Sequence, residues 1–573
     1  MKTSCSALIF ALFSFSLIIA CKKSGTTNQP PVENPDTTST AETTAQTIGF
    51  FLDDWSSKTF QAPAYTEGTV PTASTSVFVS VDAKKIITKI PQSIFGNNAN
   101  SWMTQMVTEP LLMDYLKKYH SHIIRFPGGS ISDLYFWNLP GSSKPADAPV
   151  QLLNENAVSS NAGYWNGKIT DSWTISVDNY YNMLQQTGNS GMITVNYGYA
   201  RYSTANNPVA AAAHLAADWV RYDNGRTKYW EVGNENFGTW EAGYRINIAT
   251  NKDGQPELLN GKIYGKHFKV FADSMKKAAA EIGKTIYIGA VLMEKAPASY
   301  IPSNLQTWNA DVLQQGGTAP DFYSVHSYFT PYQQNSDASS ILNSVFTEET
   351  TIMNYVKNGL QSSGIGQKPV ALTEWNIFAE GSAQQTSYIN GIHGLLVMAE
   401  AIKNKFGMAA RWDLANGWNN GNDMGLFNIG DEPGVTKWNA RPSYYYMYYF
   451  QRTAGDRMVE ATVTGNVNLK AYASSYNSGQ QSITLVNIGN TALTTTVNYK
   501  NFNPGSRFYW YTLTGGTDNG EFSKNVSVNG KGSAINAGGP SDFSSLNAYS
   551  AQASGGIKIT VPARAVVNLM IDK

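Results

Sequence analysis

Cysteine is nearly absent from this chain, with two among 573 residues. Both, Cys5 and Cys21, lie close to the N-terminus. The remainder therefore has no internal disulfide, no cysteine nucleophile and no cysteine-based metal site. Histidine is scarce too, and the six histidines show no HExxH or similar ligand spacing. The sequence thus predicts no cofactor and no metal centre, with a structural calcium left open.

Charged residues are few, and their signs balance. They make up 15% of the chain, and 42 basic and 42 acidic residues give a formal net charge of zero. This balance argues against nucleic acid as a partner. Aromatic residues reach 12%, with 14 Trp and 32 Tyr. Aromatic, weakly charged surfaces suit neutral sugars, whose apolar faces stack on rings, although aromatic side chains also fill cores.

Long hydrophobic runs are missing, apart from a short one near the N-terminus. Residues 7–20 are apolar, follow a basic start, and are too few to span a membrane. They are typical of a signal peptide, and the sequence LIIAC that ends at Cys21 resembles a bacterial lipobox, with Cys21 as the lipidated residue. Ile19 is bulkier than the usual residue there, so an ordinary secretory signal is the alternative.

The next segment, residues 22–46, is rich in Ser, Thr, Pro and Asn and holds almost no large apolar side chain. Such a segment buries too little surface to offset its ordering entropy. We therefore expect a lipoprotein signal peptide over residues 1–20 and a flexible tether over residues 21–47. The protein would be an exported bacterial lipoprotein, held by Cys21 at the outer membrane, on its periplasmic face or at the cell surface.

Apolar strand candidates alternate with amphipathic helices through the middle of the chain. The strand candidates are Ser93–Asn98, His122–Phe126, Met192–Tyr197, Tyr229–Glu235, Thr285–Leu292, Phe322–Tyr328, Pro369–Trp375 and Ala409–Leu414. The helix candidates include Thr108–Tyr119, Val209–Tyr222, Lys266–Ile282, Ser387–Lys405 and Arg441–Arg452. Strands that alternate with helices indicate a parallel sheet. The pattern predicts an α/β fold with a (β/α)₈ TIM barrel over residues 85–453.

From about residue 454 the pattern changes to short alternating runs between Gly, Asn and Ser turns. The runs are Asn468–Tyr476, Ser482–Asn487, Thr491–Tyr499, Arg507–Thr514, Gly556–Pro562 and Ala565–Ile571. They predict an antiparallel β-sandwich over residues 454–573. Two strand candidates before the barrel, Gly49–Leu52 and Ser76–Val81, predict that residues 48–84 add N-terminal strands to the same sandwich.

Two of the barrel strand candidates end in a carboxylate. Residues 230–236 read WEVGNEN and residues 370–376 read VALTEWN, so each segment places a Glu, Glu235 or Glu374, within two residues of an Asn and also contains a Trp. Catalytic groups of TIM barrels lie at the carboxyl-terminal rim, on the ends of different strands. Two carboxylates there indicate glycoside hydrolysis, with one as acid/base and the other as nucleophile or base. The alternative is that both are surface acids at loop starts.

Five motifs occur in an order that resembles a known group of enzymes. They are RFPGGS at 125–130, VNYG at 195–198, EVGNE at 231–235, VHSY at 325–328 and TEWN at 373–376. Their order resembles that of the clan A retaining glycoside hydrolases, and most closely that of the α-L-arabinofuranosidase family. That family also carries a β-sandwich built from both chain ends. The resemblance covers roughly residue 48 to the C-terminus.

The resemblance implies roles for the two acids and their neighbours. Glu235 would be the general acid/base and Glu374 the nucleophile. Asn234 would hydrogen-bond the sugar hydroxyl next to the reacting carbon. The supporting side chains would be Tyr328 as a hydrogen-bond donor to Glu374, His326 on the same floor, and Arg125 beneath the nucleophile. Further expected substrate-binding residues are Asn98, Asn196, Trp102, Trp375, Trp412 and Trp418.

One loop departs from the family pattern. In the arabinofuranosidases the loop after strand one usually carries a Glu that grips the terminal arabinose, whereas residues 95–102 read FGNNANSW here. The expected function is therefore a retaining, α-L-arabinofuranosidase-like glycoside hydrolase acting on a plant or algal oligosaccharide or polysaccharide. An endo-acting β-glycanase or a transglycosylase of the same clan, and a catalytically inactive glycan-binding lipoprotein, are the alternatives.

Overall fold

The structure is a computed structural model that describes residues 44–535 and 537–573. The predictions for the signal peptide, for most of the tether and for Cys21 lie outside the described residues. Within the part of the chain that the structure describes, none of the helices combines the length and the apolarity needed to cross a membrane.

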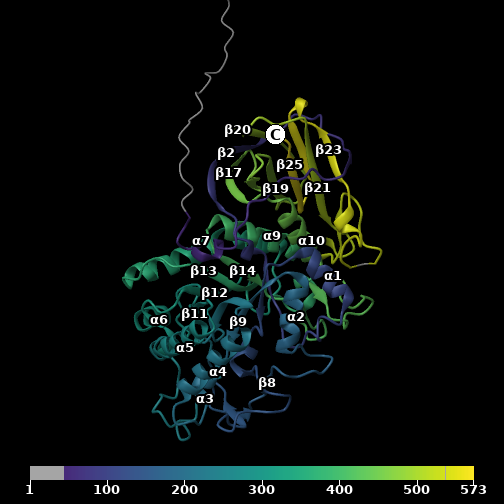
Figure 1. Ribbon diagram of the computed structural model, residues 1–573. Helices are drawn as coiled ribbons and strands as arrows, with labels where there is room; N and C mark the ends of the chain where they lie inside the picture. The colour runs from purple at the N-terminus through teal and green to yellow at the C-terminus, as the bar shows by residue number, and fades with distance from the viewer. Residues whose placement is uncertain (1–43, 536) are drawn as a thin grey trace, which may run out of the picture. The chain divides into compact units, whose positions relative to one another are not determined.

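Eight parallel strands close into a barrel in the order β10-β11-β12-β13-β14-β3-β4-β9 (Figure 1). Their bounds are β3 Gly96–Asn98, β4 Ile123–Phe126, β9 Ser190–Val195, β10 Thr227–Val232, β11 Tyr287–Val291, β12 Phe322–Tyr328, β13 Val370–Asn376 and β14 Met408–Arg411. Strands of such a barrel are covered on both faces, which explains their nearly continuous apolar runs. The predicted (β/α)₈ barrel is confirmed.

Helices surround the barrel strands, and all of the long ones except α6 begin at a capping side chain or at proline. The long ones are α1 Pro110–Tyr119, α2 Val177–Thr187, α4 Pro208–Asp223, α5 Gly261–Glu281, α6 Trp308–Gly316, α7 Ala338–Ser362, α9 Tyr388–Lys403 and α10 Pro442–Thr453. Two are short, α3 Tyr199–Tyr202 and α8 Ser382–Gln385. The side chains of Ser176, Asn207, Asn260, Asp337 and Ser387 each accept a hydrogen bond from a backbone N–H in the first turn. These caps fix the helix starts.

Two predicted strand segments are wrong, because they form 3₁₀ helices. Gln92–Phe95 is helical, so the first barrel strand is only β3. Gly49–Leu52 is also helical and does not join the sandwich. Its Phe51 ring lies 4.9 Å from the ring of Tyr229 and 5.5 Å from that of Phe322, at the amino-terminal ends of barrel strands. This segment therefore closes the end of the barrel opposite the rim that carries Glu374.

The second layer is a large, mostly antiparallel sheet in the order β1-β23-β21-β25-β19-β18-β17-β2-β20-β24, with β22 beside β21. Its strands are β1 Tyr65–Glu67, β2 Val77–Lys89, β17 Arg457–Thr464, β18 Leu469–Ser475, β19 Gln481–Asn487, β20 Leu493–Lys500, β21 Arg507–Gly515, β22 Val526–Val528, β23 Ala548–Gln552, β24 Ile557–Val561 and β25 Ala565–Ile571. Because β2 lies between β17 and β20, the N-terminal segment does contribute to the sandwich. Only β1 with β23, and β2 with β20, pair in parallel.

The sheet encloses its own core and also packs on the barrel helices. Along β25, Leu569 and Ile571 belong to the sandwich core, whereas Val566 and Met570 belong to the main core shared with the barrel. The Tyr-rich helix α10 makes part of this contact, since Tyr449 donates a hydrogen bond of 2.6 Å to the carbonyl of Phe543. The helix therefore serves packing between the two layers.

Short elements sit in the rim loops of the barrel. They are the paired strands β5 Tyr135–Phe136 with β8 Trp165–Asn166, β6 Gln151–Leu153 with β7 Ser159–Asn161, and β15 Ala415–Asn416 with β16 Phe427–Asn428. All follow a barrel strand at its carboxyl-terminal end. They enlarge the rim on which the two predicted acids lie.

Candidate active site

Two barrel strands carry the predicted acids to the same rim. Glu374 is inside β13, and Glu235 stands three residues after the end of β10. The chain turns sharply between the end of β10 and Glu235, because Gly233 has φ 77° and Glu235 itself has φ 41°. A residue other than glycine in this left-handed region is uncommon and marks a backbone that its surroundings hold in place. The turn points the Glu235 side chain over the barrel mouth.

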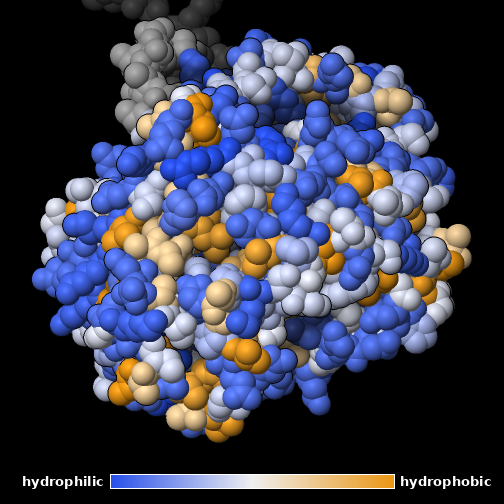
Figure 2. Space-filling model, turned by 60° about the horizontal axis from the view of Figure 1, so that its bottom comes forward, coloured by the Kyte–Doolittle hydropathy of each residue, from blue (hydrophilic) through white to orange (hydrophobic). Residues whose placement is uncertain are grey.

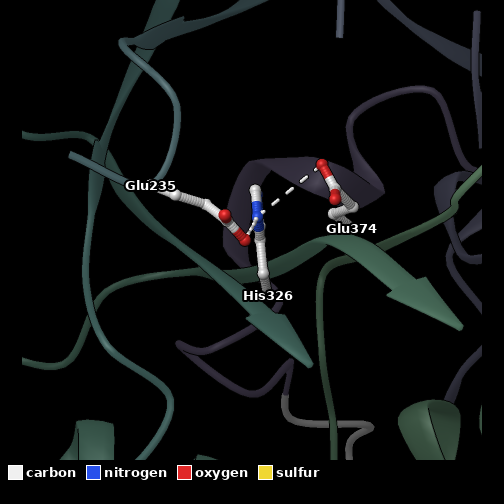
Figure 3. A group of neighbouring side chains, drawn as sticks. All are labelled: Glu235, His326 and Glu374. Atoms are coloured by element: carbon white, nitrogen blue, oxygen red, sulfur yellow. Dashed lines mark hydrogen bonds and ion pairs between the residues drawn. The ribbon is translucent and has the colours of Figure 1, made fainter. Parts of the chain in front are cut away.

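Glu235, Glu374 and His326 converge in one group, as Figure 3 shows. The Nδ1 atom of His326 lies 2.9 Å from Oε1 of Glu235 and 3.7 Å from Oε2 of Glu374. One atom from each of the three side chains lies within 4.8 Å of the others. The side chains of Glu235 and Glu374 are 18% and 7% exposed, so both acids are reachable from solvent but largely buried.

Arg125, from β4, is the fully buried centre of the site. Its Nε donates to Glu231 at 2.8 Å, its Nη1 donates to Asn98 at 2.9 Å and to Glu374 at 3.2 Å, and its Nη2 donates to Asn234 at 2.8 Å. The planar guanidinium can satisfy several acceptors at once in fixed directions. Arg125 therefore sets the relative positions of three strand ends and places a positive charge beneath Glu374.

Glu231 is a member of the site that sequence reasoning gave no role. It accepts hydrogen bonds from Thr194 at 2.9 Å and from Thr373 at 3.0 Å, in addition to that from Arg125. Burial alone would raise the pKa of Glu231, but the charges of Arg125 and His326 lower it below its usual value. The available signal was a charged residue inside an otherwise apolar strand, which a buried barrel strand tolerates only with a partner.

Tyr328 and Glu374 form the shortest contact of the site, with the Tyr328 hydroxyl donating to Oε1 of Glu374 at 2.5 Å. Burial is the largest influence on the pKa of Glu374 and raises it, against the opposing effects of His326 and Arg125. The nearby Glu235 carboxyl raises that pKa further, while the hydrogen bond from Tyr328 lowers it. The hydrogen bonds from Tyr328 and Arg125 thus stabilise the ionised form of Glu374 against the effect of burial.

His326 lies between the two acids and is tied to the barrel floor. Its Nε2 is 3.1 Å from the hydroxyl of Thr373. Burial lowers the pKa of His326, but Glu374 and the hydrogen bond to Glu235 raise it above its usual value overall. A protonated imidazole donates from both ring nitrogens. His326 can therefore donate to Glu235 and add a second positive charge to the cluster.

Asn234 is held from two sides, by Arg125 and by Glu241, and only Glu241 was missed by the sequence analysis. Its Oδ1 accepts from Arg125, and its Nδ2 donates to Glu241 at 3.0 Å. Glu241 also accepts from the hydroxyl of Ser130 at 2.7 Å, and its backbone position is seven residues beyond Asn234 in the same loop. Burial raises the pKa of Glu241 well above its usual value, with Asp133 adding to the effect. The surroundings of Glu241 thus favour its neutral form.

The two other predicted asparagines have protein partners. Asn98 donates to the carbonyls of Thr373 and Ala410, each at 3.1 Å, while its Oδ1 accepts from Arg125. Asn196 donates to the hydroxyl of Tyr202 at 3.1 Å and accepts from a backbone N–H. Their amides therefore brace the rim in the structure, and a role in binding substrate stays a prediction.

The predicted tryptophans lie in three kinds of surroundings. Trp375 is fully buried in the main core, which contradicts its expected role in substrate binding, because it has no face free for a ligand. Trp412 is 9% exposed and its ring covers Gly129, where a Cβ atom would stand 2.7 Å from a ring carbon. That contact explains the glycine pair after β4. Trp102 and Trp418 are half-buried in rim loops.

The same group of side chains could offer ligands to a metal ion, since Glu235, His326 and Glu374 each present one atom. Ligand atoms around zinc lie about 2.0–2.2 Å from the ion. The three atoms lie within 4.8 Å of one another, and the Arg125 guanidinium already contacts Glu374. The buried positive charge of Arg125 beside Glu374 disfavours a second cation at this position.

A scan against protein-family models and a search of the curated proteins find no match. Solved structures do share the fold, each over 87% of this chain and 100% of the other. An α-L-arabinofuranosidase from Thermotoga maritima, in an arabinose complex, gives a TM-score of 0.59 at 16% identity. A family 51 α-L-arabinofuranosidase from Bifidobacterium longum gives 0.60 at 14%, and a family 44 xyloglucanase from Paenibacillus polymyxa gives 0.56 at 14%.

These likenesses concern the fold. They confirm that the chain resembles the glycoside hydrolases named above in combining a TIM barrel with a sandwich built from both chain ends. Arabinofuranosidases and a xyloglucanase match at similar TM-scores. The fold therefore does not separate one substrate from the other.

Proposed function

We propose that the protein is a retaining glycoside hydrolase that cleaves a neutral glycan, with Glu374 as nucleophile and Glu235 as acid/base. The observation that supports this most is the approach of two carboxyl groups from different strand ends, with one oxygen of each within 4.8 Å. Retaining enzymes hold the pair about 5–5.5 Å apart, and inverting enzymes about 6.5–9.5 Å apart, to admit a water. The short separation favours retention.

The reaction proceeds in two displacements. In the first, a Glu374 oxygen bonds to the anomeric carbon as the bond to the leaving oxygen breaks, and Glu235 gives its proton to that oxygen. In the second, Glu235 takes a proton from water, whose oxygen bonds to the anomeric carbon and releases Glu374. The Arg125 charge and the Tyr328 hydroxyl both favour the ionised form of Glu374, which it needs as nucleophile and regains as leaving group.

Asn234 is oriented for the hydroxyl beside the reacting carbon. An amide nitrogen has two N–H donors, and one of those on Asn234 is used by Glu241. The other remains for the substrate. Because Arg125 and Glu241 hold the amide from opposite sides, it does not have to be ordered when the substrate binds, which lowers the barrier by positioning.

The first substrate class to test is an α-L-arabinofuranoside, because two of the structures that share the fold are named as enzymes for that sugar. The second candidate is endo-acting cleavage of a β-glycan. Residues 95–102, which include β3 and the start of the loop after it, carry no acid to grip a terminal arabinose, and the amide of Asn98 at the end of β3 is used by Arg125 and by backbone carbonyls. This observation favours a substrate bound along several sugar units.

We also propose export and anchoring. The support is the sequence alone, namely the apolar run over residues 7–20 and the cysteine at position 21. Mass spectrometry of the protein from a host with a lipoprotein pathway should find an N-terminal peptide that begins at Cys21 and carries acyl chains. An N-terminal peptide without lipid would instead indicate an ordinary secretory signal.

The mechanism is tested with variants of the two acids on aryl glycosides. Glu374→Ala should lose turnover. Glu235→Ala should keep the first displacement on substrates with good leaving groups, which need no proton donor, and added azide should give a glycosyl azide of retained configuration. Proton NMR of the first product from the unaltered protein reports the stereochemistry. An inverted first product, or a Glu374→Ala protein that survives where Glu235→Ala does not, would contradict the assignment.

The same assays separate the remaining alternatives. A transglycosylase shares both displacements, so product analysis with an added sugar acceptor should show transfer exceeding hydrolysis if that reading is right. An inactive glycan-binding lipoprotein would bind oligosaccharides and turn over none of the panel.

A further inference from the structure

A groove with a volume of about 900 Å³ lies at the rim, and the loop that carries Glu235 forms part of its wall. Three segments line it: the turn of the β6–β7 hairpin, the loop between β10 and α5, and the loop between β11 and α6. Phe237, two residues beyond Glu235, is part of its wall. Small-molecule sites usually measure about 300–1,000 Å³, so this groove has room for more than one sugar unit.

Two strongly exposed aromatic side chains lie in this groove, on different loops. Trp240 is 60% exposed and Tyr300 is 85% exposed. The Trp240 ring rests on Gly238, where a Cβ atom would come within 2.5 Å of the ring. Gly238 in turn donates its N–H to the carbonyl of Glu235 at 2.5 Å. One face of the Trp240 ring is thus fixed against the catalytic loop, while much of its surface remains in solvent.

Contacts between the β10–α5 loop and the β11–α6 loop hold the walls of the groove together. Tyr244 and Asn304, from the two loops, approach to 3.5 Å, and Asn304 donates to the carbonyl of Leu259 at 2.7 Å. The Phe237 ring lies 6.2 Å from that of Trp308, at the start of α6. A site on joined loops loses little entropy when it binds.

The charges in the groove are compensated. Among the lining residues that the structure describes, Arg245 pairs with Glu257, and Lys295 lies 3.5 Å from Glu294 and 3.4 Å from Glu348. A glycan rich in uronic acids would need cations that are free to bind its carboxylates. Paired cations and exposed rings suit a neutral glycan.

Figure 2 turns the lower side of Figure 1 forward, and on the face it shows, hydrophobic residues occur in small groups between hydrophilic ones. A large contiguous apolar patch would indicate a protein partner. Interspersed rings and polar groups suit sugars, which both stack and form hydrogen bonds.

We propose that this groove binds the leaving-group side of a neutral oligosaccharide or polysaccharide, with successive sugar rings on Trp240 and Tyr300. The proposal rests on the proposed function, because the acid/base, Glu235, faces the leaving oxygen and the groove continues from its loop. It makes the protein an enzyme for chains, whose remote units supply binding energy that is used in the transition state.

The test compares long and short substrates in Trp240→Ala, in Tyr300→Ala and in a control, Tyr65→Ala. Tyr65 lies on β1 of the sandwich and is 43% exposed. The probes are an aryl glycoside and the hexasaccharides of arabinose, xylose and glucose. For the cleaved hexasaccharide, the ratio of its kcat/KM to that of the aryl glycoside should fall by about fivefold or more in each groove variant, as truncating an aromatic binding residue typically gives. The control should leave the ratio unchanged.

Binding is measured separately by calorimetry on Glu374→Gln, with and without Trp240→Ala. The hexasaccharide should bind more weakly once Trp240 is removed, and hexagalacturonate should bind more weakly than the neutral chain. The groove proposal is overturned if the kcat/KM ratio is unchanged in Trp240→Ala and Tyr300→Ala and the hexasaccharide affinity is unchanged in Trp240→Ala. It is also overturned if hexagalacturonate binds more tightly than the neutral chains. If Trp240-dependent binding occurs while the unaltered protein hydrolyses nothing, the proposed function fails and the groove assignment stands.

Discussion

Replacing Tyr328 with Phe should weaken catalysis through Glu374 alone. The change removes one hydroxyl, which donates to Glu374 at 2.5 Å. Hydrogen bonds to charged groups contribute about 1.5–3 kcal/mol. If the bond favours only the ionised nucleophile, kcat/KM should fall by about tenfold to 150-fold, since 1.36 kcal/mol is a factor of ten in rate.

The pH dependence gives the prediction a direction. The Tyr328 bond lowers the pKa of Glu374, which burial raises above its usual value. Glu374 must be ionised to attack, so activity is lost as the pH falls through its pKa. Without the hydroxyl that pKa rises further, and the acid limb of the kcat/KM profile should move to higher pH. The assay is hydrolysis of an activated aryl glycoside between pH 4 and 9.

Tyr323→Phe is the matched control. Tyr323 lies on the same strand, β12, is fully buried, and its hydroxyl has no partner in the part of the chain that the structure describes. The identical deletion there should leave the rate and the pH profile unchanged. If Tyr328→Phe behaves like Tyr323→Phe, the hydroxyl of Tyr328 does not support the nucleophile, and the assignment of Glu374 loses its main local argument.

Three further outcomes follow from the contacts of the site. Glu231→Gln removes the charge that neutralises the buried Arg125. Because breaking such a pair costs about 3–5 kcal/mol, the urea concentration at the unfolding midpoint should fall. The control is Glu67→Gln, which should leave the midpoint unchanged because Glu67, paired with Arg507, is 70% exposed. Glu241→Gln should keep kcat/KM within about twofold, because the amide oxygen of Gln can accept the same hydrogen bond from Asn234. Glu241→Ala should lower kcat/KM by about twofold to tenfold, the equivalent of one lost hydrogen bond. Equal effects of the two would refute the positioning role. EDTA should leave the rate of hydrolysis unchanged, because Arg125 and His326 supply the positive charge at Glu374; loss of activity that Zn²⁺ or Ca²⁺ restores would instead make the three-residue group a metal site.

The barrel and the two acids were predictable because each follows from a local pattern. Glu374 ends an apolar run and stands inside β13, and Glu235 follows β10 by a short Gly-Asn turn. The strand Phe322–Tyr328 was predicted with its observed bounds, because its Phe, Tyr and Val residues favour a strand although Ser and His residues interrupt them. Strands that are buried on both faces consist mostly of apolar residues, so they are easy to recognise in a sequence.

Other features depend on contacts between distant segments and left no local signal. Gly49–Leu52 has a strand-like composition, yet it forms a 3₁₀ helix whose Phe51 side chain is buried beneath the barrel. Trp375 sits between Glu374 and Asn376 like a ligand platform, but β13 turns it into the core, away from the rim. Glu241 is an ordinary loop acid in the sequence and becomes a site residue only through Asn234 and Ser130.

The charge balance of the cluster explains why its two acids act as a pair. Three carboxyl groups, Glu231, Glu235 and Glu374, face the Arg125 guanidinium and the His326 ring, and Glu374 and Glu235 raise the pKa of His326. Glu231 is held ionised beneath them by Arg125, which leaves Glu235 and Glu374 to share what remains of the positive charge. The negative charge of Glu235 disfavours the ionised form of Glu374. This effect contributes to the raised pKa of Glu374, because Glu235 is one of the groups that raise it. A proton on Glu235 relieves it, and that proton is the one a double displacement must give to the leaving group.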